Sequence, residues 1–464
     1  MGTMTHIAGR AAFSKAVDIV LKNADKDREK EITKLVDLME KYMGSEKIDV
    51  DYNKVKELIC DKDKTLNKYI NRLLDEINPH VLKTTALNLG YEAFFHGTKT
   101  IRKMREVHDC NVPWLILMDP TSACNLHCTG CWAAEYGNKL NLTFDEMDSV
   151  ITQGKELGIY LYMFTGGEPL VRKEDIKLCK KHSDCAFLAY TNGTLVDEKL
   201  CEQMVEVGNF YLAISLEGFE AVNDLRRGNG VYGKVMHAME LLKQYGLIFG
   251  TSICYTSKNI ETVTSDEFVD LMVEKGCRYA FYFHYMPVGN DAAVELLPTM
   301  QQRIYMKDRV RQIRNMKDGK GIFTMDFQND GEYVGGCIAG GRNYFHINAN
   351  GDAEPCVFIH YSGANIRTHS LLEILKQPLF MAYRDRQPFN ENHLRPCPML
   401  ENPEILQQMV KETGAKSTDL QSPEDVTHLC GKCEEYARKW KPCAERLWAE
   451  EKHKKHSYEN YKKK

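Results

Sequence analysis

Two hydrophobic patterns divide the chain. Up to about residue 110, apolar residues recur at helical spacing, for example at Ile32, Leu35, Val36 and Met39. From residue 112 onward, short continuous apolar runs alternate with amphipathic segments. The first pattern predicts a helical N-terminal domain over residues 1–110. This domain either packs on the rest of the chain or serves as a substrate cap or a surface for a partner or membrane. An apolar cluster suits either use: Leu87, Leu89, Tyr91, Phe94 and Phe95.

The second pattern predicts strands that alternate with helices. Strands are expected at residues 114–118, 161–165, 186–190, 211–216, 248–255 and 279–283, with helices at 143–157, 172–181, 197–207, 233–245 and 265–275. Such alternation is typical of βαβ units that build a parallel sheet. Five or six units make an α/β barrel or partial barrel. In such barrels the chemistry lies at the carboxyl ends of the strands.

Composition narrows the class of protein. The 464 residues suggest about three domains. A net charge of −4 gives no electrostatic case for binding nucleic acid. The 16 cysteines occur in spaced clusters of a long chain, which is unlike a secreted disulfide framework. The sequence shows no signal peptide and no apolar run long enough to span a membrane. We therefore expect a cytoplasmic protein.

Three cysteines follow the first predicted strand at spacing C-x3-C-x2-C: Cys124, Cys128 and Cys131. Three such thiolates can bind three irons of a cubane [4Fe–4S] cluster and leave the fourth iron open to a small molecule. A zinc site and three core cysteines are the alternatives. Structural zinc needs four ligands, and no fourth lies next to this triplet. Trp132 after Cys131 excludes the c-type haem signature.

Further motifs follow the next predicted strands. Gly166-Gly167-Glu168-Pro169 comes after the second, Thr191-Asn192-Gly193 after the third and Ser215-Leu216-Glu217-Gly218 after the fourth. Glycines let the backbone approach a ligand closely. Carboxylate and hydroxyl groups can bind an ammonium or ribose hydroxyls. Arg226 or Arg227 could pair with a ligand carboxylate. Ordinary turn chemistry would explain each motif taken alone.

Together, the cysteine triplet and the strand-end motifs resemble the radical S-adenosylmethionine (SAM) superfamily over about residues 112–330. The resemblance implies a partial (β/α)6 TIM-like barrel over residues 111–325. It also implies that SAM binds the open iron and is cleaved by one electron to a 5′-deoxyadenosyl radical, which abstracts hydrogen from an unactivated C–H bond. The electron would come from a reductant such as flavodoxin or ferredoxin. The implied SAM contacts are Gly166, Gly167, Glu168, Asn192, Ser215, Glu217 and Arg227.

One position departs from the family pattern. Radical SAM proteins commonly carry an aromatic residue just before the third cysteine, near the adenine. Here Gly130 holds that position, and Trp132 lies one place beyond Cys131. The departure concerns the adenine contact and leaves the cluster ligands unaffected.

Residues 326–445 contain six more cysteines. The run Cys337-x13-Gly351-x4-Cys356 resembles the opening of the SPASM or twitch extensions, which bind an auxiliary cluster. A hairpin turning at Asn350-Gly351 would bring its two cysteines together. Six thiolates are too few for two complete cubane clusters, so one auxiliary [4Fe–4S] cluster is expected. The expected ligands are Cys337, Cys356, Cys397 and Cys433, with Cys430 as the alternative fourth, Cys443 unassigned and structural zinc as the competing interpretation.

Weaker candidates complete the site. His284 and Tyr285 follow the sixth strand and Asp326 follows another apolar run, so all three are candidate catalytic groups at the barrel mouth. The tail over residues 446–464 is basic and would be a solvated end or attracted to a membrane surface.

The expected function is that of a radical SAM enzyme that modifies a peptide or protein, or that joins or modifies lipid alkyl chains. The helical N-terminal domain lacks the β pattern of a winged-helix leader-peptide domain, and peripheral contact with a membrane stays open. A non-catalytic iron–sulfur electron-transfer or scaffold protein is the alternative. Such a protein would not need the motifs at residues 166–169 and 215–218.

Overall fold

The computed structural model describes residues 3–23, 26–43, 51–133, 136–137 and 139–452. Its first part is helical, as the sequence predicts, and no strand precedes residue 115 in the described chain. The elements are α1 (Thr3–Asn23), α2 (Arg28–Met43), α3 (Tyr52–Cys60), α4 (Thr65–Glu76), α5 (Pro79–Thr85), the π-helix η2 (Ala86–Gly97) and α6 (Thr98–His108).

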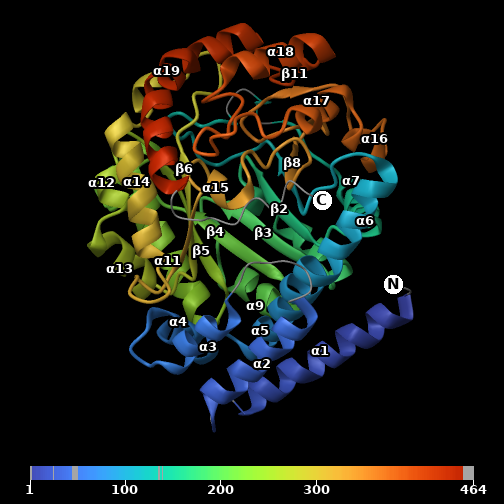
Figure 1. Cartoon of the computed structure of the whole chain (residues 1–464), viewed down its shortest axis with the longest axis vertical. Coiled ribbons are helices and arrows are strands. Elements are labelled where there is room, and N and C mark those ends of the chain that lie inside the picture. Colours follow the sequence, from blue (N-terminus) through green and yellow to red (C-terminus); the bar gives the residue numbers. More distant parts are fainter. Residues whose placement is uncertain (1–2, 24–25, 44–50, 134–135, 138, 453–464) are drawn as a thin grey trace.

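A curved, mostly parallel sheet follows, which confirms the predicted α/β partial barrel (Figure 1). Across the described residues, nine strands lie in the order β7-β6-β5-β4-β3-β2-β1-β8-β9. All six expected strands are present, and the sheet extends beyond them by β7 on one edge and by β8 and β9 on the other. The bounds are β1 (Leu115–Thr121), β2 (Leu161–Gly166), β3 (Ala186–Thr191), β4 (Phe210–Ser215), β5 (Phe249–Tyr255), β6 (Tyr279–His284), β7 (Phe323–Asp326), β8 (Tyr344–Ile347) and β9 (Ala353–Glu354).

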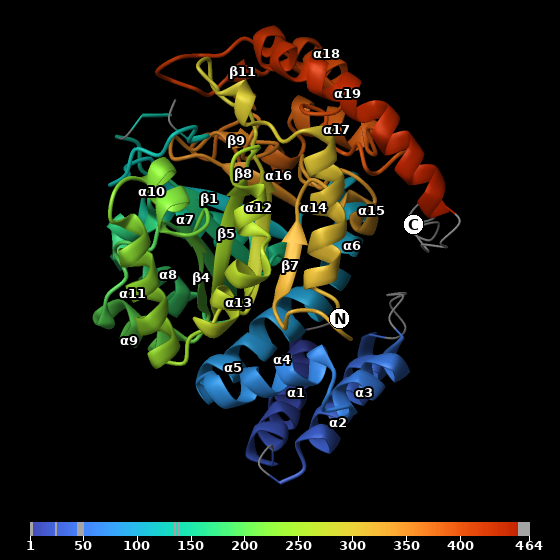
Figure 2. The same cartoon turned by 90° about the vertical axis from the view of Figure 1, so that its left-hand side faces the viewer.

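Helices between the strands cover the outer side of the sheet (Figures 1 and 2). Thr143 begins the first of them with a capping box, in which its side chain accepts from the Glu146 N–H and Glu146 accepts from the Thr143 N–H. The helices are α7 (Phe144–Glu156), α8 (Ile176–Lys181), α9 (Glu198–Val207), α10 (Glu220–Arg227), α11 (Val231–Gln244), α12 (Ile260–Val263), α13 (Asp266–Glu274) and α14 (Met300–Ile313).

The N-terminal helices cover the amino ends of the strands, below the barrel in Figure 2. Asn78 N donates to the carbonyl of Gly246 ahead of β5, and Tyr69 OH donates to that of Arg278 ahead of β6. Tyr211 of β4 lies within 2.9 Å of the Thr85 hydroxyl of α5. Because the chemistry of α/β barrels lies at the opposite, carboxyl ends, these helices are a floor for the barrel and do not cap its mouth.

The helical run continues through Gly97. Gly97 has helical backbone angles and ends η2, which continues directly into α6. A Cβ at this position would lie 2.5 Å from the carbonyl oxygen of Gly158. The glycine therefore permits close contact with the loop before β2 and does not end the helix.

The C-terminal part forms a second hydrophobic core beside the barrel core. Its elements are α15 (Gly331–Val334), β10 (Tyr361–Ser362), α16 (Leu371–Leu375), α17 (Pro378–Arg386), α18 (Pro403–Thr413), β11 (Lys416–Ser417) and α19 (Val426–Lys452). The expected start of the basic tail at residue 446 falls inside α19. Residues 453–464 of that tail lie outside the described chain. No helix of the described residues is both long and apolar enough to cross a membrane.

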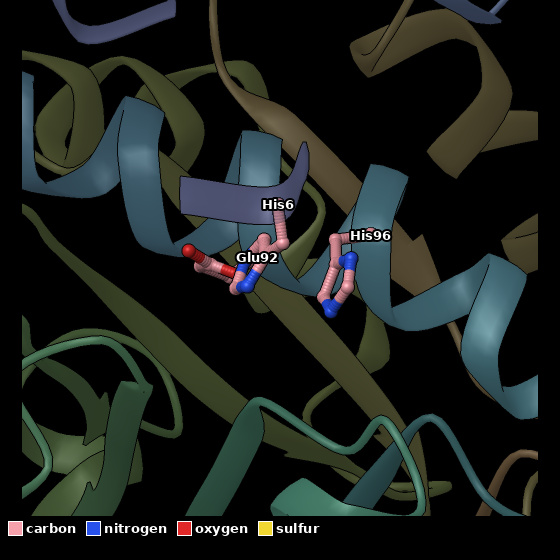
Figure 3. A group of neighbouring side chains, drawn as sticks. All are labelled: His6, Glu92 and His96. Carbon is pink, nitrogen blue, oxygen red and sulfur yellow. The ribbon is translucent and has the colours of Figure 1, made fainter. Parts of the chain in front are cut away.

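A buried carboxylate anchors α1 on η2 (Figure 3). Glu92 is 0% exposed, and it pairs with His6 Nε2 at 2.8 Å and Arg10 Nε at 2.6 Å. His96 stacks on His6 with ring centres 3.7 Å apart and an interplanar angle of 9°. His6, Glu92 and His96 are close enough to hold a metal ion. Arg10 already balances Glu92, however, and two parallel imidazole rings do not direct their lone pairs at one point. The group is explained as an ionic anchor.

We expect Glu92→Gln to loosen α1 because it leaves Arg10 and His6 without their buried counter-charge. The cost should be about 2 kcal/mol, below the usual value for a broken buried pair because both partners are partly exposed. Hydrogen exchange should quicken in residues 3–23 and stay unchanged in the barrel strands. Asp18→Asn is the matched control, since Asp18 pairs with Lys83 at the exposed face of α1. Equal acceleration in both variants would contradict the anchor.

Candidate functional site

The cysteine triplet lies in the loop after β1, at the carboxyl edge of the sheet. Burial raises the pKa of the Cys124 thiol to about 11 and also raises that of Cys131, and the nearby Cys128 adds to both shifts. This proximity fits three thiolates that each hold one iron of a cluster.

The glycine turn after β2 packs directly on the start of the cysteine loop. Gly166 has φ of +103°, and a Cβ on Gly167 would lie 2.2 Å from the carbonyl oxygen of Ala123. Glu168 N donates to that same carbonyl at 2.8 Å. Only glycines allow this approach. The turn therefore lies against the residues that precede Cys124, where a ligand of the cluster's open iron would be.

Glu168 itself is buried and largely satisfied. Its carboxylate accepts from the Thr191 hydroxyl at 2.6 Å, from Asn192 N at 2.7 Å and from Leu170 N at 2.9 Å. Burial raises its pKa, and these donors oppose the shift. With three donors in place, Glu168 joins the ends of β2 and β3 and has one accepting position left for a ligand ammonium.

Asn192 joins the third strand to the cysteine loop. Its side-chain Nδ2 donates to Asn125 Oδ1 at 2.8 Å, and its own Oδ1 accepts from Thr194 N at 2.9 Å. Asn125 directly follows Cys124. Asn192 therefore supports the cysteine loop. In the sequence, its position at the end of a strand is what marked it as a candidate site residue.

The motif after β4 forms a charged rim. Arg226 Nη1 donates to Glu217 Oε1 at 2.7 Å, and Arg227 also pairs with Oε1. Arg227 Nη1 lies 3.9 Å from Cys128 Sγ, so this rim adjoins the cysteine loop. Glu217 Oε2 is buried without a hydrogen-bond partner. An unpaired buried carboxylate oxygen is costly, and a ribose hydroxyl of SAM would satisfy it. The residues therefore fit the nucleoside. Ser215 is half-buried beside them.

The ring of Tyr285 lies over Gly130, the position that departs from the family pattern. Gly130 has φ of +67°, and a Cβ there would lie 3.0 Å from the Tyr285 ring. The Tyr285 hydroxyl accepts from Ala293 N at 3.1 Å, which fixes the ring. An aromatic side chain at position 130 would collide with it. The glycine is thus explained by a ring that arrives from the end of β6.

The C-terminal cysteines all belong to the second core. The predicted hairpin is present, since β8 pairs antiparallel with β9 and Gly351 has φ of +85° at the turn. Cys337, Cys356 and Cys397 form one group: Cys356 raises the thiol pKa of Cys337, and both raise that of Cys397, although burial is the larger cause in each case. The Tyr344 hydroxyl lies 2.7 Å from Cys356 Sγ. These three could hold the auxiliary cluster.

Cys430 and Cys433 lie one turn apart on α19, both buried. Burial raises the pKa of both thiols, and repulsion by Cys430 raises that of Cys433 further. The structure brings both into the core of the other three, so each remains a candidate fourth ligand. Cys443 is partly exposed on the same helix.

Two of the candidate catalytic residues are buried and hydrogen-bonded to tyrosines. His284 is 1% exposed and its Nε2 lies 2.7 Å from the Tyr436 hydroxyl of α19. Burial lowers its pKa to about 3. Asp326 is also 1% exposed and accepts from the Tyr255 hydroxyl at 3.1 Å. The third candidate, Tyr285, lies over the cysteine loop.

Aromatic side chains line the inside of the barrel. The rings of Tyr190 in β3 and Phe283 in β6 lie 5.8 Å apart, although β4 and β5 separate these strands in the sheet. Such a contact is made across the concave interior. Phe283 stacks on Phe327 at 4.4 Å, and Tyr190 OH contacts Met163 Sδ at 3.7 Å. All four side chains pack against the barrel core and are partly exposed, so part of their apolar surface is accessible.

Sequence reasoning missed a buried group of charges beneath the cysteine loop. Asp119 at the end of β1 pairs with His346 of β8 at 2.9 Å, and His346 bonds Glu354 of β9 at 2.7 Å. All three are at most 1% exposed. In the sequence, the only sign of this group was a charged residue, Asp119, inside an apolar run. Its partners could not be recognised because they lie far away in sequence.

Two family models match the chain. The radical SAM superfamily matches residues 118–274, and an iron–sulfur cluster-binding domain, SPASM, matches residues 337–399. These ranges contain the cysteine triplet and strand-end motifs in one case and Cys337, Cys356 and Cys397 in the other.

Similar proteins have several activities. An AdoMet-dependent heme synthase of Methanosarcina barkeri is 24% identical over 73% of this chain and 93% of its own length. A PqqA peptide cyclase of Granulibacter bethesdensis is 26% identical over 59% and 76%. SuiB of Streptococcus suis, solved with S-adenosylmethionine, has a TM-score of 0.54 at 18% identity and covers 72% of this chain and 81% of that chain. In a complex with precursor peptide SuiA its TM-score is also 0.54 at 18% identity, with 75% and 81% covered.

The fold, the cysteine loop with its adjoining motifs, and both family matches therefore agree. The cofactors are SAM and [4Fe–4S] clusters. Residues 118–274 form a radical SAM domain, and residues 337–399 form a SPASM iron–sulfur cluster-binding domain.

Proposed function

We propose that this radical SAM enzyme acts on a hydrocarbon chain, abstracting hydrogen from an unactivated C–H bond of a lipid so that alkyl chains are modified or joined. The aromatic barrel interior carries the proposal. Tyr190, Phe283, Phe327 and Met163 leave apolar surface partly exposed. A hydrocarbon segment would bury that surface favourably, at about 25 cal/mol per Å² of apolar area removed from water.

In this proposal Cys124, Cys128 and Cys131 hold the SAM-binding cluster, and Cys337, Cys356, Cys397 and one cysteine of α19 hold the auxiliary cluster. When bound, the cluster and SAM supply a 5′-deoxyadenosyl radical at the cost of one electron. Gly166 and Gly167 would admit the methionine part, and Glu217 Oε2 would accept from the ribose. Arg227 pairs with Glu217 and would be a cation for the SAM carboxylate.

The barrel itself restricts the reaction. The N-terminal helices close the amino end, so substrate enters from the carboxyl end beside the cysteine loop. Aromatic walls offer few polar atoms to bind water, which protects a carbon radical from side reactions. Tyr285, over Gly130, lies between the loop and this interior and is the candidate for contacting adenine or substrate. The electron comes from a small reductant such as flavodoxin or ferredoxin, in a reducing compartment such as the cytoplasm.

A peptide is the second candidate substrate. Two of the similar proteins are named for peptides, the PqqA peptide cyclase and SuiB with precursor peptide SuiA. Against it stands the N-terminal part, which is helical in its described residues and lies at the closed end of the barrel. A leader peptide bound there would be far from the cysteine loop.

Serine substitution of Cys124, Cys128 and Cys131 should lower the iron content of reconstituted protein from about eight to about four per chain. It should also abolish reductive cleavage of SAM. Cys201→Ser is the control, since Cys201 is buried on the outer side of the barrel. Iron analysis and chromatography of 5′-deoxyadenosine measure both outcomes. Full iron content in the triple variant would contradict the assignment.

Phe283→Asp should block substrate conversion, because a carboxylate would replace apolar surface in the interior. Conversion should fall more than about tenfold, equivalent to about 1.4 kcal/mol, while SAM cleavage without substrate continues. Phe283→Leu preserves apolar surface and should retain most conversion. If the two variants convert substrate equally, the apolar interior does not bind the substrate.

Comparing lipid and peptide extracts of cells with and without the active protein separates the two substrates. We expect new lipids with altered or joined alkyl chains and an unchanged peptide pool. Mass spectrometry of both extracts provides the measurement, and cells with the triple cysteine variant provide the background. New peptide masses with unchanged lipids would refute the hydrocarbon proposal and favour the second candidate.

A further inference from the structure

Trp132, the residue after the last loop cysteine, is held by the auxiliary domain. Its ring meets His346 at 5.8 Å and His360 at 6.0 Å, both at steep angles. Tyr136 stacks on His360 at 4.5 Å and completes the surroundings. The position of Cys131 is therefore coupled through Trp132 to side chains more than two hundred residues further along the chain.

The two histidines belong to a buried chain of charges. His346 is placed between Asp119 at 2.9 Å and Glu354 at 2.7 Å, and His360 Nδ1 bonds Asp419 at 2.6 Å. Glu354 also accepts from the Tyr136 hydroxyl at 2.8 Å. The side chains of Asp119, His346, Glu354, His360 and Asp419 are each at most 2% exposed. Three carboxylates contact two imidazoles. Opposite charges therefore lie next to one another and hold the group in a fixed geometry.

The neighbouring carboxylates favour the charged form of both imidazoles. Burial alone would favour their neutral form, but Asp119 and Glu354 raise the pKa of His346 to about 10. Asp419 and Glu354 likewise raise the pKa of His360 against the effect of burial. Removing one partner of such a buried pair leaves an uncompensated charge.

The same chain reaches the glycine turn. Gly166 lies so close to Asp119 that a Cβ would be 2.9 Å from the Asp119 Cβ. Asp119 Oδ2 is buried without a hydrogen-bond partner. The charge chain therefore adjoins both the glycine turn and, through Trp132, the cysteine loop. A unit charge at this depth is weakly screened and acts on a nearby redox centre.

We propose that Asp119 and His346 are positioning residues for the cluster of the cysteine loop: they hold Trp132 and Cys131, and their charges set the reduction potential of that cluster. The proposal rests on the assignment of Cys124, Cys128 and Cys131 as its ligands. It gives the auxiliary domain a second role, because His346 and Glu354 come from its hairpin.

The test uses charge changes of opposite sign. In reconstituted holoenzyme, EPR-monitored redox titration follows the signal that changes when SAM is added. His346→Gln removes a positive charge and should make the potential more negative. Asp119→Asn removes a negative charge and should make it more positive. Each shift should be about tenfold in the reduction equilibrium, which is about 59 mV for one electron. His182→Gln is the control, a buried histidine that pairs with Asp148 on the outer side of the barrel.

If the two residues had only a structural role, the reduction potentials of both variants would shift in the same direction or would not change. Either result would overturn the proposal. If His346→Gln fails to load iron, Asp119→Asn decides alone, with an unchanged potential counting as refutation. Trp132→Phe should keep the EPR line shape and Trp132→Leu should alter it. Absence of any SAM-responsive signal in the unaltered protein would instead refute the ligand assignment.

Discussion

The pairing of β1 with β8 joins the two iron–sulfur regions in one sheet. Strand β1 lies between β2 of the barrel and β8 of the auxiliary domain, parallel to both. The cysteine loop leaves its carboxyl end, and the hairpin that leads to Cys356 begins beside it. Backbone pairing therefore fixes the spacing of the two regions before any cluster binds. The charges of Asp119, His346 and Glu354 lie on this joint and depend on its register.

The two ends of the barrel have different roles. Helices of the first 108 residues close the amino end and tie it to the loops before the strands. The carboxyl end carries the cysteine loop, the glycine turn and the charged rim of Glu217, Arg226 and Arg227. Between them lies an interior to which Tyr190, Phe283, Phe327 and Met163 contribute partly exposed apolar surface. A reactive centre at one end and a closed floor at the other favour a substrate that inserts a hydrocarbon segment and keeps its polar part outside.

Sequence reasoning predicted the fold class and the site's location because short apolar runs and strand-end motifs are local signals. It did not predict side-chain direction in β6, where a continuous apolar run from Tyr279 to Phe283 hides which positions face inward. The hydrogen bonds of His284 with Tyr436 and of Asp326 with Tyr255 join residues distant in sequence, and local patterns carry no signal for them. It also missed the ion pair of Asp119 with His346 and the contact of Tyr285 with Gly130. Both join residues distant in sequence, so only the folded sheet brings them together.

The most direct test of a hydrocarbon substrate is the origin of the abstracted hydrogen. Reduced holoenzyme and SAM would be incubated with vesicles of phospholipid carrying fully deuterated acyl chains, and the 5′-deoxyadenosine analysed by mass spectrometry. The account predicts that deuterium enters 5′-deoxyadenosine, and that Phe283→Asp abolishes the transfer. Active SAM cleavage without deuterium transfer from these acyl chains would contradict it.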